Sequence, residues 1–388
     1  MQQGYFAGMP KEAVYAIAMV LVGVVVLSVF IAPLAGVTSW LERRVWARMQ
    51  SRVGPNRVGP QGILQWLADG IKNLLKEDII PAAADKKLFS LAPYIVFMGF
   101  LCTFVVIPFG GRLIVADLNI GILYILAVTS LVVVGILMAG WASNNKWSLL
   151  GGMRSAAQIV SYEIPAGLSV LTIIFLAGSL SMQDIIKAQG WGPWDWFIFR
   201  NPFTFAAFFL YFTAALAEGN RTPFDIPEAE SELVAGYVTE YSGMRFLMFF
   251  FAEWGNLYVI GAVATTLFLG GWQVPPVTEN ATLLGILEFV VFFLKAYLWV
   301  FVAMWIRATL PRVRVDQLMT LCWKYMVPLS FMCLLGTAIL MLVLSKNLER
   351  IISAATLGLG IAVMVIFFLR VIFQIRYARP ELYFKLHI

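Results

Sequence analysis

Carboxylate side chains are concentrated in one short segment, residues 218–245, which reads EGNRTPFDIPEAESELVAGYVTEYSGMR. Pro223 and Pro227 prevent this segment from running as a single helix. An acidic run of this kind is either a solvated loop or a cluster of groups that bind and release protons. Its carboxylates are Glu218, Asp225, Glu228, Glu230, Glu232 and Glu240.

Two further glutamates, Glu163 and Glu253, lie inside long apolar stretches on either side of Glu218. Each follows the start of its stretch by seven residues, or about 10 Å along a helix. A carboxylate exposed to lipid at a helix centre costs roughly 2.5 kcal/mol or more, so both are expected to face a protein interior or a water-filled cavity. The three are predicted to form a proton relay, with structural hydrogen bonding as the alternative.

A second polar feature is the segment 62–77, where apolar residues recur at helical spacing. This pattern predicts an amphipathic helix in or near the membrane interface. One reading is a basic helix that only anchors the chain to anionic lipid. Asp69, midway along the polar face, argues against it, because a carboxylate there repels anionic headgroups. That face is therefore predicted to look into protein or a polar cavity.

The elements that position these residues follow from composition. The chain has 388 residues, 61% of them hydrophobic and 13% charged, against roughly 25% charged in soluble proteins. This excludes an ordinary soluble protein and predicts an all-α integral membrane protein, one polytopic domain over 1–388. About nine spans are expected, the last being an extra C-terminal span, at 14–40, 89–110, 121–142, 156–178, 203–217, 246–269, 283–306, 325–344 and 352–375.

Basic residues predict the orientation of the spans. The odd-numbered connections and the C-terminal tail hold 20 Lys and Arg, whereas the N-terminus and the even-numbered connections hold 6. Lys and Arg favour the cytoplasmic side, so the N-terminus is expected outside and the C-terminus inside. The first stretch, 14–40, is too long for a signal peptide and is expected to be a retained membrane anchor.

Several chemistries lack their ligands in this sequence. Cys102, Cys322 and Cys333 have no CxxC spacing, which argues against an iron–sulfur or zinc site, and His387 is the one histidine. No GxGxxG or Walker A motif is present, so neither NAD nor ATP is expected to bind by those routes. The chain is expected to hold no redox cofactor and to bind no nucleic acid.

Two long strings are typical of one family. GPNRVGPQGILQWLADGIKNLLKEDIIP and EGNRTPFDIPEAESELVAGYVTEYSGMRF, with SYEIP in the fourth stretch, strongly resemble the H subunit of bacterial NADH:quinone oxidoreductase, or complex I. The resemblance extends along nearly the whole chain. It departs from the family in 179–202, an aromatic-rich segment that looks inserted, and in the span 352–375, which exceeds an eight-helix core.

The resemblance implies a bacterial inner-membrane subunit that forms much of a quinone tunnel. It implies partners: peripheral-arm subunits with the terminal iron–sulfur cluster, small membrane subunits and antiporter-like pump subunits. Iron–sulfur clusters, FMN and NADH would belong to those partners, with quinone as substrate. The implied quinone-binding residues are Arg43, Asp69, Arg221, Phe224, Glu228 and Glu230. The implied proton-coupling residues are Glu163, Glu218, Glu232, Glu240 and Glu253.

Two other classes share part of this pattern. The membrane anchor of an energy-converting hydrogenase has a similar acidic architecture but passes electrons to protons. An independent proton or ion transporter would use the same glutamates for binding, although inverted repeats and paired broken spans are absent from the sequence. The GPNRVGP string and the amphipathic helix favour the quinone enzyme.

Overall fold

The fold is a bundle of long helices. We describe a computed structural model of the chain over residues 23, 26–227, 229–275, 280–343 and 346–377. No strand occurs in these residues, which confirms the all-α class. Six helices are long and apolar enough to cross a membrane: Lys86–Thr103, Gly121–Ala142, Lys146–Ala177, Gly243–Phe268, Ala281–Thr309 and Val315–Val343.

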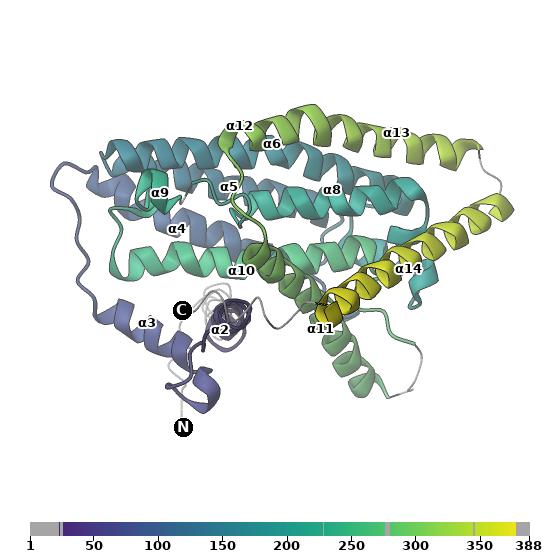
Figure 1. Cartoon of the computed structure of the whole chain (residues 1–388), viewed down its shortest axis with the longest axis horizontal. Helices are drawn as coiled ribbons and strands as arrows, with labels where there is room; N and C mark the ends of the chain where they lie inside the picture. The colour runs from purple at the N-terminus through teal and green to yellow at the C-terminus, as the bar shows by residue number, and fades with distance from the viewer. Residues whose placement is uncertain (1–22, 24–25, 228, 276–279, 344–345, 378–388) are drawn as a thin grey trace, which may run out of the picture.

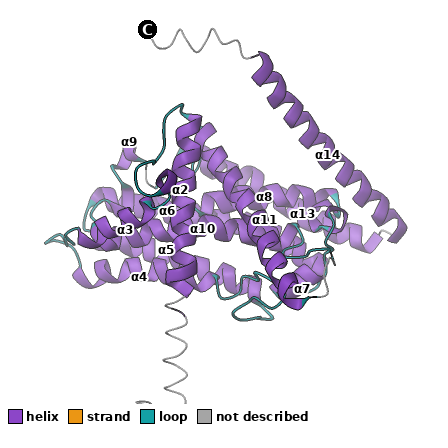
Figure 2. Ribbon diagram, turned by 90° about the horizontal axis from the view of Figure 1, so that it is seen from below, coloured by secondary structure: helices purple, strands orange, loops and turns teal. Residues whose placement is uncertain are grey.

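Five helices form the centre of the fold. Helices α4 (Lys86–Thr103), α5 (Gly121–Ala142), α6 (Lys146–Ala177), α8 (Pro202–Glu218) and α10 (Gly243–Phe268) run side by side (Figure 1). The helices α12 (Val315–Thr320) and α13 (Val327–Val343), joined by a π-helical turn, pack on α6. Helix α2 (Ala32–Met49) crosses the bundle instead of running along it and packs on α10 and α11 (Ala281–Thr309) (Figure 2).

The predicted spans that fall in the described residues map onto helices of this structure with two boundary corrections: α4 ends at Thr103 rather than at 110, and α6 begins before 156. Much of the first stretch, 14–40, lies outside the described residues, as do both chain ends. The interpretation of 143–155 as a connection is wrong for most of its length, because α6 already begins at Lys146. Asn145 caps that helix by accepting a hydrogen bond from the Trp147 amide. The stretch 156–178 covers only the apolar part of α6, and the helix begins ten residues earlier, among polar residues.

The amphipathic helix is present but shorter than predicted. Helix α3 covers Gln65–Leu75 rather than 62–77, and residues Pro60–Gly62 before it form a 3-10 turn. Gln61 and Gly62 adopt positive φ angles, and a Cβ at Gly62 would overlap the Pro55 carbonyl oxygen. The GPNRVGPQG string is therefore a tight, crowded turn that delays the start of the helix.

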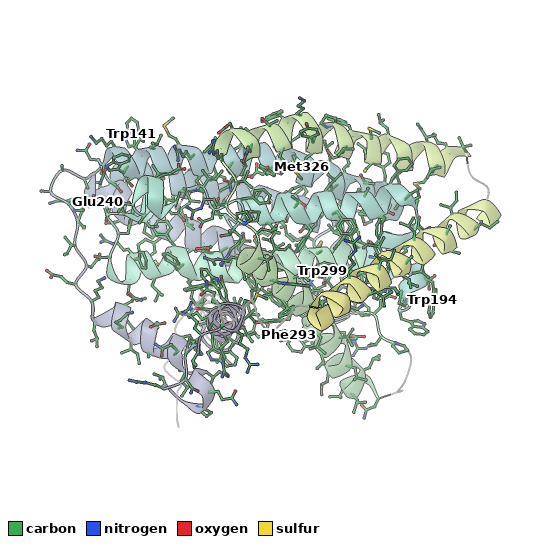
Figure 3. The ribbon with its side chains drawn as sticks, viewed as in Figure 1. Trp141, Trp194, Glu240, Phe293, Trp299 and Met326 are labelled. Atoms are coloured by element: carbon green, nitrogen blue, oxygen red, sulfur yellow. The ribbon has the colours of Figure 1, made fainter. Side chains whose placement is uncertain are left out.

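The connections gather at two ends of the bundle. At the acidic end, Asn145 donates to Glu240 and the Ile79 amide donates to Ser242. The opposite end, which we call the aromatic end, holds the aromatic-rich segment 179–202. There the Gly270 amide donates to the Gln189 side chain, and Lys295 of α11 donates to a backbone carbonyl. Glu240 and Trp141 lie at one end and Trp194 at the other (Figure 3). Odd-numbered connections therefore meet at one end and even-numbered ones at the opposite end.

The segment 179–202 and the C-terminal helix contact each other. The first holds α7 (Met182–Lys187) and the short turns Pro193–Asp195 and Phe197–Phe199. Helix α14 (Lys346–Tyr377) touches these turns and α8, and the Thr356 hydroxyl donates to the Phe199 carbonyl at 2.5 Å. The rest of α14 leans away from the bundle (Figure 2).

Close packing of α5 on α4 yields a stability prediction. A Cβ added at Gly135 would lie 2.5 Å from a Val96 methyl carbon and 3.1 Å from the Val96 backbone nitrogen. We expect Gly135→Ala to destabilise the protein by about 1–3 kcal/mol through overpacking. Thermal unfolding of the purified protein in detergent measures it. Gly167→Ala is the control, because a Cβ there meets nothing within 4 Å; equal midpoints for both variants would contradict this packing.

Candidate functional site

A buried ion cluster lies where α2, α10 and α11 meet the acidic connection. The Arg221 guanidinium lies 3.1 Å from Oε1 of Glu42 and 3.2 Å from Oε1 of Glu253. Arg307 of α11 pairs with the same Glu42 oxygen, and the Trp254 indole donates to its Oε2 at 3.0 Å. The side chains of Glu42 and Arg221 are 5% and 3% exposed. Charges so fully removed from water require partners of opposite sign.

Glu42 and Arg307 were missed by the sequence reasoning. Glu42 comes just after the apolar stretch 14–40 and Arg307 directly after 283–306, so each was counted as an ordinary charge of a connection. The available signal was an acidic residue before two arginines in an otherwise basic segment. Spacing could not show that the ends of two distant stretches meet, because the two residues are 265 positions apart in the chain.

An apolar cavity of about 240 Å³ lies beside this cluster, between α2, α3 and α10. Arg43 and Asp69 close one side of it with an ion pair of 2.6 Å. Asp69 thus turns toward α2, whereas Lys72 on the same face of α3 is 70% exposed. Trp254 joins the cavity to the cluster, because it lines the cavity, donates to Glu42 and lies under the Arg43 guanidinium. Leu74, which also lines the cavity, and Leu75 are exposed.

The acidic connection is folded against the bundle and is not a solvated loop. Phe224 is buried and its ring packs on Tyr162 at 5.8 Å between centroids. Asp225 pairs with Arg312 at 3.0 Å. Burial raises the pKa of the Asp225 carboxyl above its usual range, and the neighbouring guanidiniums, Arg312 first, lower it in part. Gln158 of α6 donates to the Phe224 carbonyl at 2.7 Å and so fixes this turn.

The remaining acidic residues of the connection are dispersed. Glu228 lies outside the described residues, and Glu230 begins the short helix α9 (Glu230–Leu233). Glu232 pairs with Arg154 at 2.6 Å, while Glu240 accepts from Asn145 at 2.7 Å. These two contacts are made with the start of α6 and the residue before it, so they hold the connection against that helix instead of joining the buried ion cluster.

The three intramembrane carboxylates do come together. Glu253 and Glu218 line one cavity of about 50 Å³ between α4, α5, α8 and α10. Glu218 and Glu163 are close enough to interact electrostatically. Glu163 also accepts a hydrogen bond from Ser130 of α5 at 2.9 Å. The structure therefore places them as a row that starts at the ion cluster, because Glu253 belongs to both.

Glu288 and Lys295, the two charged residues in the middle of α11, have separate partners. Glu288 accepts from the Gly111 amide at 2.8 Å. Lys295 donates to the carbonyls of Leu269 and Gly271 at 2.9 and 3.1 Å. Both side chains therefore bond backbone groups outside α11. In the described residues, no three His, Cys, Asp or Glu side chains group as a metal site.

A multi-helix bundle with buried charges and an apolar side cavity defines a polytopic membrane protein. The NADH dehydrogenase family model matches residues 21–338. Similar proteins include the NADH-quinone oxidoreductase H subunit of Anaeromyxobacter dehalogenans, 54% identical over 87% of this chain and 85% of that protein. Others are the H subunit of Dehalococcoides mccartyi (strain CBDB1; 51%, covering 89% and 90%) and the second H subunit of Koribacter versatilis (47%, covering 81% and 95%).

The chain therefore belongs to the family of NADH-quinone oxidoreductase H subunits. It is a membrane-embedded component of a multi-subunit oxidoreductase complex. The resemblance seen in the sequence strings is confirmed. Helix α14 begins at Lys346, beyond the last residue that the family model matches.

The ion cluster predicts a large effect of neutralising Glu42. Glu42→Gln leaves Arg221 and Arg307 in a buried site with one carboxylate fewer, which we expect to cost roughly 3–5 kcal/mol. The readouts are the amount of chain assembled in membranes and its thermal midpoint. Glu42→Gln with Arg307→Gln should recover part of the loss.

The matched control is Glu77→Gln, whose side chain is exposed. It removes the same charge at the surface and should leave assembly unchanged. Wild-type assembly and stability of Glu42→Gln would show that the cluster does not carry this part of the fold.

Proposed function

We propose that this chain forms much of the quinone tunnel of NADH-quinone oxidoreductase and couples quinone reduction to proton translocation through its buried glutamates. One observation carries the proposal: polar and charged groups lead from the apolar cavity into the bundle. The cavity wall Trp254 bonds Glu42, Glu42 pairs with Arg221, and Arg221 pairs with Glu253. From Glu253 the row continues to Glu218 and Glu163.

The cavity suits an amphipathic ligand such as a quinone. Its walls are mainly apolar, which fits a hydrocarbon tail, and guanidinium and carboxyl groups at one side fit a polar headgroup. The exposed apolar face of α3 lies next to it, so a ligand can arrive from the bilayer. We assign quinone contact to Arg43, Asp69, Arg221, Phe224, Glu228 and Glu230.

Electrons are supplied by partners in this proposal. Peripheral-arm subunits would carry NADH, FMN and the iron–sulfur clusters, and this chain would hold no redox centre of its own. They would dock at the acidic end, with the N-terminus outside and the C-terminus in the cytoplasm. Small membrane subunits and antiporter-like pump subunits would receive the signal within the bilayer of a bacterial inner membrane.

A change of charge at the ion cluster would couple quinone reduction to proton translocation. Reduction of a quinone to a quinol takes two electrons and two protons, so the reaction changes the charge beside the cluster. The carboxylates that interact with the cluster then redistribute protons along the row. A changed charge pattern in the row biases the conformation of neighbouring subunits, which is how a local electrostatic event acts at a distance. Glu232 and Glu240 would extend the route toward the acidic end.

Filling the cavity tests the tunnel. Gly70 of α3 lines it, and a Cβ there meets nothing within 4 Å, so Gly70→Leu projects into open space. We expect the KM for a long-tailed quinone to rise about tenfold, because steric overlap costs about 1–3 kcal/mol and 1.4 kcal/mol is a factor of ten. Steady-state kinetics of the assembled complex measure it. Gly285→Leu is the control, since its Cβ also meets nothing within 4 Å and it lies on α11. An unchanged KM for Gly70→Leu would argue against this tunnel.

Neutralising the row tests the coupling. Glu218→Gln and Glu253→Gln keep the shape of each side chain but remove its exchangeable proton, so proton translocation per NADH should fall severalfold, as expected for loss of a proton-transfer group. The measurement is proton uptake and NADH:quinone turnover in sealed membranes, with Glu77→Gln as the control. If turnover and translocation are both unchanged in the two variants, the row does not couple.

A further inference from the structure

One small cavity lies between Glu253 and Glu218, and a second adjoins Glu218. The first, of about 50 Å³, is lined by both glutamates, and the second, of about 30 Å³, is lined by Glu218. A cavity needs roughly 10–15 Å³ of such space to hold a water molecule, so each of the two can hold water. Three polar side chains line both cavities and mark where they meet: Glu218, Thr129 of α5 and Asn256 of α10.

The Asn256 side chain lacks a hydrogen-bond partner within the described residues. It follows Glu253 by three residues on α10, so both side chains lie on the same helix face. It is partly buried, yet its amide makes no hydrogen bond to any side chain or backbone group within the described residues. Its amide is therefore available to bond water or another polar group in the cavities that it lines. The two cavities supply the place where that partner sits.

The neighbouring hydroxyl cannot take the same role. Thr129 has a single proton, which it donates to the Leu126 carbonyl at 3.0 Å. Toward water in the cavities it therefore offers only lone pairs. Asn256 differs because its NH₂ donates and its carbonyl oxygen accepts. It can bond water or a carboxyl in either protonation state, which a relay between two glutamates requires.

We propose that Asn256 is the positioning residue that joins the two cavities and holds water in a transferable chain between Glu253 and Glu218. This inference rests on the proposed function and adds a residue to it. When Glu253 is protonated and Glu218 ionised, the amide NH₂ group supports the carboxylate and its oxygen orients the bridging water. The proton passes from Glu253 through water to Glu218, and the same amide accommodates the reversed charge.

The test replaces Asn256 by Leu, which has similar size and no hydrogen-bonding group. In the assembled complex we expect NADH:quinone turnover to fall by roughly tenfold or more, the order typical of losing a positioned proton-transfer group. The KM for quinone should stay unchanged because Asn256 does not line the quinone cavity. The solvent deuterium isotope effect on turnover should rise, since proton transfer becomes rate-limiting. Asn256→Ser, which leaves a hydroxyl and room for one more water, should restore most of the rate.

The control is Thr266→Val on the same helix, whose hydroxyl bonds only the Ala262 carbonyl within the described residues. It removes a polar group without touching either cavity and should leave turnover and the isotope effect at wild-type values. Should the leucine reduce assembly, Asn256→Val is equally apolar and smaller, and carries the same expectations. A wild-type rate and isotope effect in an assembled apolar variant would overturn the proposal.

The glutamate variants separate this inference from the proposed function. If Glu218→Gln and Glu253→Gln lower proton translocation while Asn256→Leu leaves turnover and the isotope effect unchanged, only the role of Asn256 is wrong. If all three variants keep wild-type turnover and proton translocation, the assignment of the glutamate row to proton transfer is wrong. A raised KM for quinone without a larger isotope effect would assign Asn256 to the shape of the bundle and would also overturn the proposal.

Discussion

The pairing of Glu42 with Arg221 and Arg307 is the constraint on which the rest of the structure depends. Glu42 ends the apolar part of α2, Arg221 begins the acidic connection after α8, and Arg307 ends α11. Charges buried this deeply must be paired, so these three elements are forced to meet at one place. Their meeting gives α2 its crossing position, and that position leaves the apolar cavity between α2, α3 and α10.

The two ends of the bundle are built differently. At the aromatic end, Gln189 and Lys295 bond backbone groups near the end of α10, and Glu288 holds the Gly111 amide. Side chains there are used to close turns. Toward the acidic end and in the interior, carboxylates instead line small cavities or pair with arginines. Glu288 and Lys295, which lie inside an apolar helix, are likewise both engaged with backbone groups.

Much of this could be predicted from the sequence because lipid imposes simple rules. Apolar length marked the helices, and the cost of intramembrane charge singled out Glu163 and Glu253 before any geometry was known. Asp69 could be predicted to turn inward because one acid on a basic face conflicts with anionic lipid.

The tertiary contacts could not be predicted. Glu42 and Arg307 looked like ordinary charges of the connections, and α6 extends beyond its apolar stretch because helical hydrogen bonding does not stop where the apolar residues end. The place of Asn256 on both small cavities was hidden too, since an amide in an apolar stretch carries no sign of its neighbours. The aromatic segment 179–202 and the C-terminal helix looked like unrelated additions, whereas the bond from Thr356 to the Phe199 carbonyl shows that they pack together.

The central claim is that quinone reaches the cavity between α2, α3 and α10 beside the Glu42 cluster. Photolabelling of the assembled complex with a photoreactive quinone, followed by mass spectrometry of this chain, tests it most directly. If quinone enters this cavity, labelled peptides come from the first span, 63–76 or 221–232, and excess unmodified quinone suppresses the labelling. Labelling confined to other helices, or no label in those three segments, would contradict it.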